Sequence, residues 1–169
     1  MDAMEAILTR RSVRSYKADQ IPEALIKSLL DAAMSAPSAG NQQPWQFVLI
    51  DDRKMLLEIT KVHPYASMLS HAPLAIVVCG DLSRERFKGY WVQDCSAATQ
   101  NLLIAARAQG LGAVWLGVYP LSDRVGGIRR ILGLPEDIVP LAVVSMGYPV
   151  VAQSPADRYE ESRIHRNGW

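Results

Sequence analysis

Unbroken apolar runs place the strongest limit on what this chain can fold into. Leu74–Cys79 is apolar at every position, which predicts a strand that is covered on both faces. Further strands are predicted at Phe47–Ile50, Gly112–Val118 and Val139–Met146. The chain therefore has to supply elements for both sides of this strand.

Helical periodicity separates these strands. The longest helix is predicted from Tyr90 to Gln109, and its small residues Cys95–Thr99 permit the close approach of a sheet or another helix. Pro22 opens a second helix. Asp2 and Ser122 are the expected caps of two more. The shorter helices are predicted at Met4–Leu8, Lys54–Thr60 and Ser122–Leu132.

Length and charge exclude several classes of protein. A chain of 169 residues suits one domain, residues 1–169. Lys plus Arg number 18 and Asp plus Glu 17, and this net charge of +1 argues against nucleic-acid binding. Without a signal peptide or an apolar run long enough for a membrane, a cytoplasmic location is expected. Cys79 and Cys95 are expected to be buried thiols.

The C-terminal residues differ from the rest of the chain. After Pro149 the sequence is polar, carries Arg158, Arg163 and Arg166, and offers little core of its own. It is therefore either a disordered tail or a segment that lies across another surface, most simply a second protomer. Trp169 favours docking, because an exposed indole forgoes a large gain from burial.

A basic turn is the first candidate for ligand binding. Arg10 and Arg14 are four residues apart, so at a helix end they point the same way. With the Ser12 hydroxyl they can grip a terminal phosphate through charge-assisted hydrogen bonds. A cluster this short also fits a solvated basic turn, and on its own residues it favours that interpretation.

A polar loop, Pro37–Trp45, is the second candidate. It places hydroxyl and carboxamide groups between two prolines that restrict the backbone, which suits a planar heterocycle with many donors and acceptors. An ordinary helix-to-strand connection fits equally well, because Ser, Gly and Asn supply turn conformations.

No catalytic motif accompanies these segments. The histidines are scattered, and no phosphate-binding Gly-x-x-x-x-Gly-Lys motif is present. Gly110-Leu111-Gly112 lacks a third glycine and precedes a strand, so it is not a dinucleotide-binding fingerprint. An enzyme built on this sequence would take its chemistry from a cofactor.

In this order and spacing, the segments resemble the nitroreductase family of FMN-dependent oxidoreductases. The resemblance continues from the basic turn and the polar loop through Asp94–Ala106, Gly110–Gly117 and Met146–Pro149 to Arg166. It implies an α+β fold in which helices flank a central mixed or antiparallel sheet. It also implies an intertwined homodimer, in which the C-terminal extension 150–169 reaches the partner subunit.

The resemblance further implies how FMN is bound. The basic turn would hold the phosphate and the ribityl chain, the polar loop of the partner subunit would contact the rings, and a backbone N–H near Gly117 would lie at flavin N5. Arg14 would reach the pyrimidine edge, and Arg163 is a weaker choice than Arg166. The implied residues are Arg10, Arg11, Ser12, Arg14, Pro37, Ser38, Ala39, Asn41, Gln43, Leu116, Gly117 and Arg166.

The implied activity is a ping-pong transfer of two electrons. NADH or NADPH reduces the flavin, and a small organic acceptor, such as a nitro compound or a quinone, is then reduced without a catalytic side chain. Because the chain is short, only His63–His71 and Arg84–Tyr90 are expected as lid material. Two alternatives remain: an FMN-binding or storage module without turnover, and a relative with different flavin chemistry, such as dehalogenation or desaturation.

Overall fold

A single antiparallel sheet organises the chain. The computed structural model describes residues 1–151 and 156–169. Within them, β1 (Trp45–Ile50), β2 (Leu74–Asp81), β3 (Gly112–Gly117) and β4 (Ile138–Gly147) pair in the order β1-β2-β4-β3. Every neighbouring pair of these strands is antiparallel. The predicted strands are therefore confirmed, and β3 lies at an edge of the sheet.

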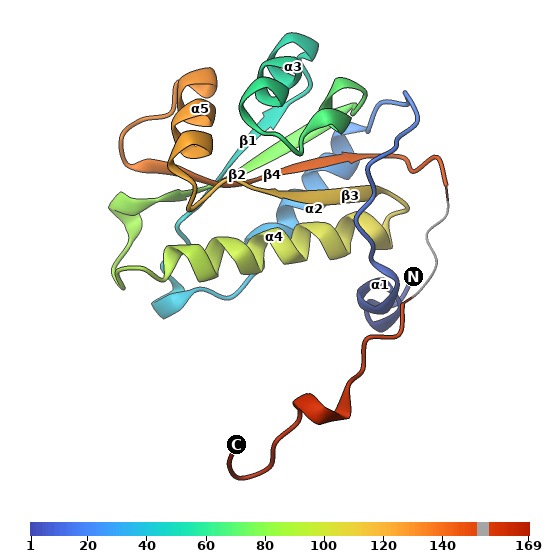
Figure 1. The fold of residues 1–169 in the computed structure, drawn as a ribbon, viewed down its shortest axis with the longest axis vertical. Coiled ribbons are helices and arrows are strands. Elements are labelled where there is room, and N and C mark those ends of the chain that lie inside the picture. Colours follow the sequence, from blue (N-terminus) through green and yellow to red (C-terminus); the bar gives the residue numbers. More distant parts are fainter. Residues whose placement is uncertain (152–155) are drawn as a thin grey trace.

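Helices cover both faces of this sheet. α2 (Glu23–Met34) and α4 (Trp91–Ala108) pack on one face, and α3 (Arg53–Val62) and α5 (Ser122–Leu132) pack on the other (Figure 1). α1 (Ala3–Thr9) lies against α4. This arrangement confirms the predicted α+β class with a sheet flanked by helices.

β2 explains why both faces need cover. Alternate residues of a strand point to opposite faces, so Ile76 and Val78 enter the core beneath α2 and α4. Val77 and Cys79 enter the second core, beneath α3 and α5. Ile76, Val77, Val78 and Cys79 are all fully buried. The continuous apolar run of the sequence is thus used on both sides.

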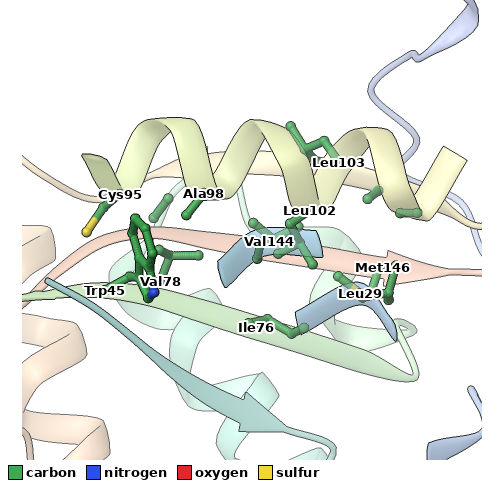
Figure 2. Close-up of a cluster of buried hydrophobic side chains, with 14 of the residues drawn as sticks. Leu29, Trp45, Ile76, Val78, Cys95, Ala98, Leu102, Leu103, Val144 and Met146 are labelled. Carbon is green, nitrogen blue, oxygen red and sulfur yellow. The ribbon is translucent and has the colours of Figure 1, made fainter. Parts of the chain in front are cut away.

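The small residues of α4 face the sheet of their own chain. Cys95 and Ala98 lie over Trp45 and Val78 in the first core (Figure 2). Their small volume lets α4 approach the sheet closely, as predicted. This face of α4 is consequently not free to pack across a dimer.

Both cysteines are buried thiols, as predicted. The Cys95 thiol donates to the Cys79 carbonyl oxygen at 3.5 Å. Burial raises the pKa of the Cys79 thiol to about 12 and that of Cys95 still further, so both stay protonated. Neither group is suited to serve as a nucleophile.

The two ends of the chain leave apolar side chains uncovered. Asp2 caps α1, its Oδ1 accepting from the Glu5 N–H at 2.9 Å. However, Met4 and Leu8 of the predicted apolar stripe of α1 are exposed. The last described segment, residues 156–169, extends away from the sheet past α1, and Trp169 at its end is fully exposed (Figure 1).

α5 differs at its start from the prediction. Ser122 is the first residue of the helix, and Leu121 occupies the N-cap position without a capping side chain, so the predicted Ser122 cap is wrong. The glycine pair within this helix has a packing role. A Cβ on Gly127 would lie 2.8 Å from the Val62 Cβ, whereas a Cβ on Gly126 would meet no atom within 4 Å. Gly127 therefore allows α5 to approach the end of α3.

We expect Gly127→Ala to destabilise the protein by about 1–3 kcal/mol, because the new methyl group forces α5 away from α3. Gly126→Ala is the matched control. It adds the same methyl group in open space and should raise stability by up to about 1 kcal/mol through helix propensity. Urea unfolding of both variants measures the difference, and equal effects would contradict the packing role.

Candidate active site along the open edge of β3

The basic turn runs beside β3 rather than lying at a helix end. Ser12 pairs in parallel with Ala113, and the Val13 N–H donates to the Ala113 carbonyl at 3.0 Å. The prediction that Arg10 and Arg14 share one side of a helix end is therefore wrong. The chain is extended here, and its alternation places exposed Ser12 and Arg14 on the side opposite buried Val13.

Gly112 makes this close approach possible. A Cβ at Gly112 would lie 2.6 Å from Cγ1 of Val13, closer than side chains pack. Val13 is buried in the core beneath α3 and α5, which fixes the basic turn against the sheet edge. The first residue of β3 thus has to be a glycine for packing reasons, although it belongs to no dinucleotide-binding fingerprint.

Positive charge gathers where the basic turn begins. Burial and then the positive charges of Arg158 and Arg11 lower the pKa of the half-buried Arg10 guanidinium. Among the described residues, none of the ion pairs includes Arg10, Arg11, Arg14 or Arg158. Positive charge that gathers around Arg10 in this way, without an ion pair among the described residues, attracts anions.

Arg158 is a residue that the sequence interpretation did not select. That interpretation chose Arg166, with Arg163 as a weaker option, from the same arginine-rich segment. Arg163 pairs with the nearby Glu160, and Arg166 is exposed farther along the extension. The sequence alone does not indicate which of Arg158, Arg163 and Arg166 lies near Arg10 in the fold.

The outer edge of β3 presents backbone groups to the same side as the basic turn. The Ala113 carbonyl points to this edge, so strand alternation directs the peptide groups of Trp115 and Gly117 there too. The Val118 N–H, one residue farther, points back to the Leu141 carbonyl of β4. The N–H of Gly117 therefore faces the open edge, while Leu116 faces β4.

Two side chains hold the carbonyl of Gly117. His63 Nε2 and Arg124 Nη1 each lie 2.9 Å from the Gly117 oxygen. A Cβ built on Gly117 would meet no atom within 4 Å, so the space beside its backbone is open. From Gly112 to Gly117 the strand spans roughly 17 Å, and it joins the arginine cluster to this open space.

The polar loop is held in place by a buried carboxylate of α4. Asp94 accepts from the Ala39 N–H at 2.9 Å and from Gln42 Nε2 at 2.7 Å. Gln42 Oε1 in turn accepts from the backbone N–H groups of Arg86 and Phe87. Because Asp94 and Gln42 are both buried, these bonds lock the loop to α4 and to the segment before it.

Backbone strain marks the same loop. Asn41 and Gln43 adopt φ values of 54° and 46°, a left-handed conformation that side chains other than glycine rarely take. The Gln43 N–H donates to Ser38 Oγ at 3.0 Å, and its side chain donates to Asn41 Oδ1 at 2.8 Å. Such strain persists where surrounding bonds impose it, and it often marks a functional segment.

An open pocket of about 340 Å³ lies beside this loop. Its lining consists of Pro37, Ser38, Ala39, Tyr90, Gln93, Asp94 and Ala97. Among the described residues, no hydrogen bond or ion pair joins the loop to the basic turn or to Gly117. Within one chain, the polar loop lies beside the start of α4 and the basic turn beside its end, so these two predicted parts of the site are separate.

Comparison with known proteins identifies the family. The family model described as "Nitroreductase family" matches residues 7–66 and 56–148. A protein of Methanothermobacter thermautotrophicus named "Putative NADH dehydrogenase/NAD(P)H nitroreductase" is 52% identical over 169 residues, covering 100% of this chain and 88% of the relative. The chain belongs to the nitroreductase family.

Solved structures of this family share the fold. The crystal structure of a "Putative NADH dehydrogenase/NAD(P)H nitroreductase" from Parabacteroides distasonis has a TM-score of 0.95 at 45% identity, covering 99% of this chain and 98% of that one. An "FMN-dependent Nitroreductase" of Clostridium difficile has a TM-score of 0.91 at 25% identity, covering 98% and 99%. The nitroreductase family is one of oxidoreductases, so the predicted family, fold and class of enzyme are confirmed.

Neither segment predicted as lid material is a loop free of contacts with the rest of the protein. In the first, His63–His71, the residues His63, Ala66, Met68 and Leu69 are buried, so about half of that segment belongs to the core. The second, Arg84–Tyr90, is largely exposed and is tied to the polar loop through Gln42.

Among the described residues, no helix is both long and apolar enough to cross a membrane.

Proposed function

We propose that this nitroreductase-family chain binds FMN and uses it to pass electron pairs from NADH or NADPH to a small organic acceptor. The open edge of β3 is the observation that carries the proposal. It joins an unpaired arginine cluster at one end to a glycine N–H beside open space at the other. FMN has a matching shape, with a dianionic phosphate at one end and a planar ring system at the other.

The arginine cluster fits the phosphate. Arg10 and Arg11 line one cavity beside Gly112, and Arg158 adds its charge from the C-terminal segment. Ser12 supplies a hydroxyl donor, and guanidinium groups bind phosphate through strong charge-assisted hydrogen bonds. We assign Arg166 the predicted role of completing this site, with Arg158 as an added ligand.

The opposite end fits the flavin ring. The bare Cα of Gly117 allows a ring to approach its backbone, and its outward N–H suits a hydrogen bond to N5. Arg14, exposed on the same edge, is proposed for the pyrimidine side, where it would stabilise negative charge. Leu116 is buried in the core beneath α3 and α5, so its proposed role is to support the backbone of Gly117 from within the protein.

The remaining contacts are proposed to come from a second protomer. The polar loop lies apart from the rest of the site within one chain, so Pro37, Ser38, Ala39, Asn41 and Gln43 of the partner would close the cleft. The extension 150–169 would reach across the dimer, and contact between the two protomers would bury Trp169 and the apolar side of α1, which are exposed in a single chain. Residues 152–155 of this extension lie outside the described residues. We propose the whole chain as one FMN-binding domain that works in the cytoplasm.

When bound, FMN would supply two-electron hydride chemistry between a reduced nicotinamide and the acceptor. The protein's residues bind and orient: the arginines fix the phosphate, Gly117 positions the reacting edge, and the polar loop holds the ring face. No described side chain is needed as an acid, because protons can come from solvent. The acceptor, a nitro compound, a quinone or a similar molecule, would enter the same cleft.

An absorption spectrum of the purified protein, followed by anaerobic addition of NADH and of NADPH, tests the proposal. We expect a yellow protein whose flavin is bleached by at least one nicotinamide and recoloured by a nitroaromatic or a quinone. Bound flavin that neither nicotinamide reduces would favour storage or another flavin chemistry instead. A colourless protein that does not take up added FMN would contradict the proposed site.

A further inference from the structure

The carbonyl of Gly117 has an unusual pair of hydrogen-bond donors. One comes from His63, where α3 ends, and the other from Arg124 in the first turn of α5, each at 2.9 Å. A single donor satisfies a strand-end carbonyl. Here, two donors from two helices converge on one oxygen and occupy both of its lone pairs.

The imidazole of His63 is held in one orientation. Its Nδ1 accepts from the Tyr65 N–H at 3.3 Å, so Nε2 carries the proton and donates to Gly117. Burial lowers the pKa of His63, the hydrogen bond to Gly117 opposes this in part, and the positive charge of Arg124 lowers the pKa further, so the ring stays neutral. The side chain is 2% exposed, so it has little freedom to leave this position.

Arg124 is oriented just as firmly. Its guanidinium lies over the Tyr65 ring, 5.5 Å from the ring centre. Gly127, one turn farther along α5, lacks the Cβ that would collide with Val62, so the start of α5 reaches the end of α3. The close packing of these helices brings both donors to the same oxygen.

The residue that these donors hold is a glycine, whose backbone has the widest conformational freedom. The Gly117 carbonyl belongs to the peptide group that it shares with the Val118 N–H, whereas the Gly117 N–H belongs to the preceding group, shared with Leu116, which pairs with β4. The two donors therefore fix the group after Gly117, and together with β4 they keep the glycine extended, with its N–H toward the open edge. Among the described residues, no strand pairs with the outer edge of β3 beside Gly117 and holds its carbonyl. Two donors from outside the sheet take over that role.

We propose that His63 and Arg124 are positioning residues that hold the Gly117 N–H in the direction required by flavin N5. The inference rests on the proposed function and extends it to two side chains that need not touch the flavin. A hydrogen bond from this N–H favours oxidised N5, which is an acceptor, over reduced N5, which carries a hydrogen. The orientation of Gly117 therefore sets both the reactivity and the redox potential of the bound FMN.

Paired substitutions test this role. His63→Leu and Arg124→Met remove a donor, whereas His63→Gln and Arg124→Lys keep one. In the purified FMN-loaded protein, we expect each donor-removing variant to speed flavin reduction by saturating nicotinamide about tenfold, or about 1.4 kcal/mol, because the oxidised flavin loses a hydrogen bond that the reduced flavin does not use. The midpoint potential should rise, while the dissociation constant of FMN should change by less than about threefold, since it depends mainly on the distant phosphate contacts. The donor-keeping variants should stay close to the wild-type rate and potential.

Two outcomes separate this inference from the proposed function. A wild-type protein that binds FMN and is reduced normally, but whose potential and rate are unchanged in both donor-removing variants, would overturn the positioning role alone. A wild-type protein without bound or reducible FMN would remove the proposed function itself. If buried His63→Leu does not fold, the Arg124→Met and Arg124→Lys pair gives the same comparison at a half-buried site.

Discussion

Replacing Arg10 with alanine is expected to weaken FMN binding by roughly tenfold to a hundredfold, because one charge-assisted hydrogen bond to a phosphate contributes about 1.5–3 kcal/mol. The fold should remain intact. Arg10 is repelled by Arg11 and Arg158 and, within the part of the chain that the structure describes, forms no ion pair, so its removal relieves repulsion in the protein without FMN. Loss of ligand binding without loss of stability distinguishes a binding residue from a structural one.

Fluorescence titration of the flavin-free protein with FMN measures this effect, and thermal unfolding without FMN monitors the fold. Arg130→Ala is the matched control, because it removes the same charge from the exposed side of α5, away from the basic turn. Equal FMN affinity in the Arg10 and Arg130 variants would exclude Arg10 from the phosphate site. The affinity of the wild-type protein should also fall with added salt, as expected for a charged ligand.

Replacing Asp94 with alanine is expected to cost about 2–6 kcal/mol of stability, since it leaves one buried and one part-buried donor unpaired at about 1–3 kcal/mol each. These donors are the Ala39 N–H and the Gln42 amide, both of which the carboxylate now accepts. The strained loop at Asn41 and Gln43 loses its anchor, so we also expect FMN uptake to fall.

Asp94→Asn should have an intermediate effect. Its carbonyl oxygen can keep one of the two bonds, but its amide group faces the Gln42 amide, whose oxygen is already held by Arg86 and Phe87. Gln93→Ala is the control, because Gln93 lines the same pocket but is exposed. Chemical unfolding and FMN titration of all three variants measure the effect, and an Asp94→Ala protein as stable as the control would refute the anchoring role.

Much of the secondary structure was predictable because it follows from local patterns. The apolar run of β2 required cover on both faces, and the structure supplies α2 and α4 on one side and α3 and α5 on the other. The periodicity of α4 gave its length to within a residue or two at each end. Local patterns failed where the helix end itself was at issue, as with Ser122, because a cap depends on the geometry of the preceding turn.

The basic turn shows that a residue set can be proposed for a site from a geometry that the structure does not have. A spacing of four grouped Arg10 and Arg14 as neighbours on a helix, whereas the chain is extended beyond Arg10 along β3. Ser12 and Arg14 still share a side, because an extended chain repeats every second residue. The residue types were informative without the conformation, since guanidinium and hydroxyl groups suit phosphate in either case.

By itself, then, the sequence determined the elements and the two-sided burial of the sheet, because each depends on neighbouring residues, and the family, through the order of its segments along the chain. Only the tertiary structure brought Arg158 to Arg10, Asp94 to the loop through Gln42, and His63 and Arg124 to Gly117. His63 and Gly117 are 54 residues apart, and Gln42 and Asp94 are 52 apart. Contacts over such separations arise from how helices pack on a sheet, and no periodicity along the chain encodes them.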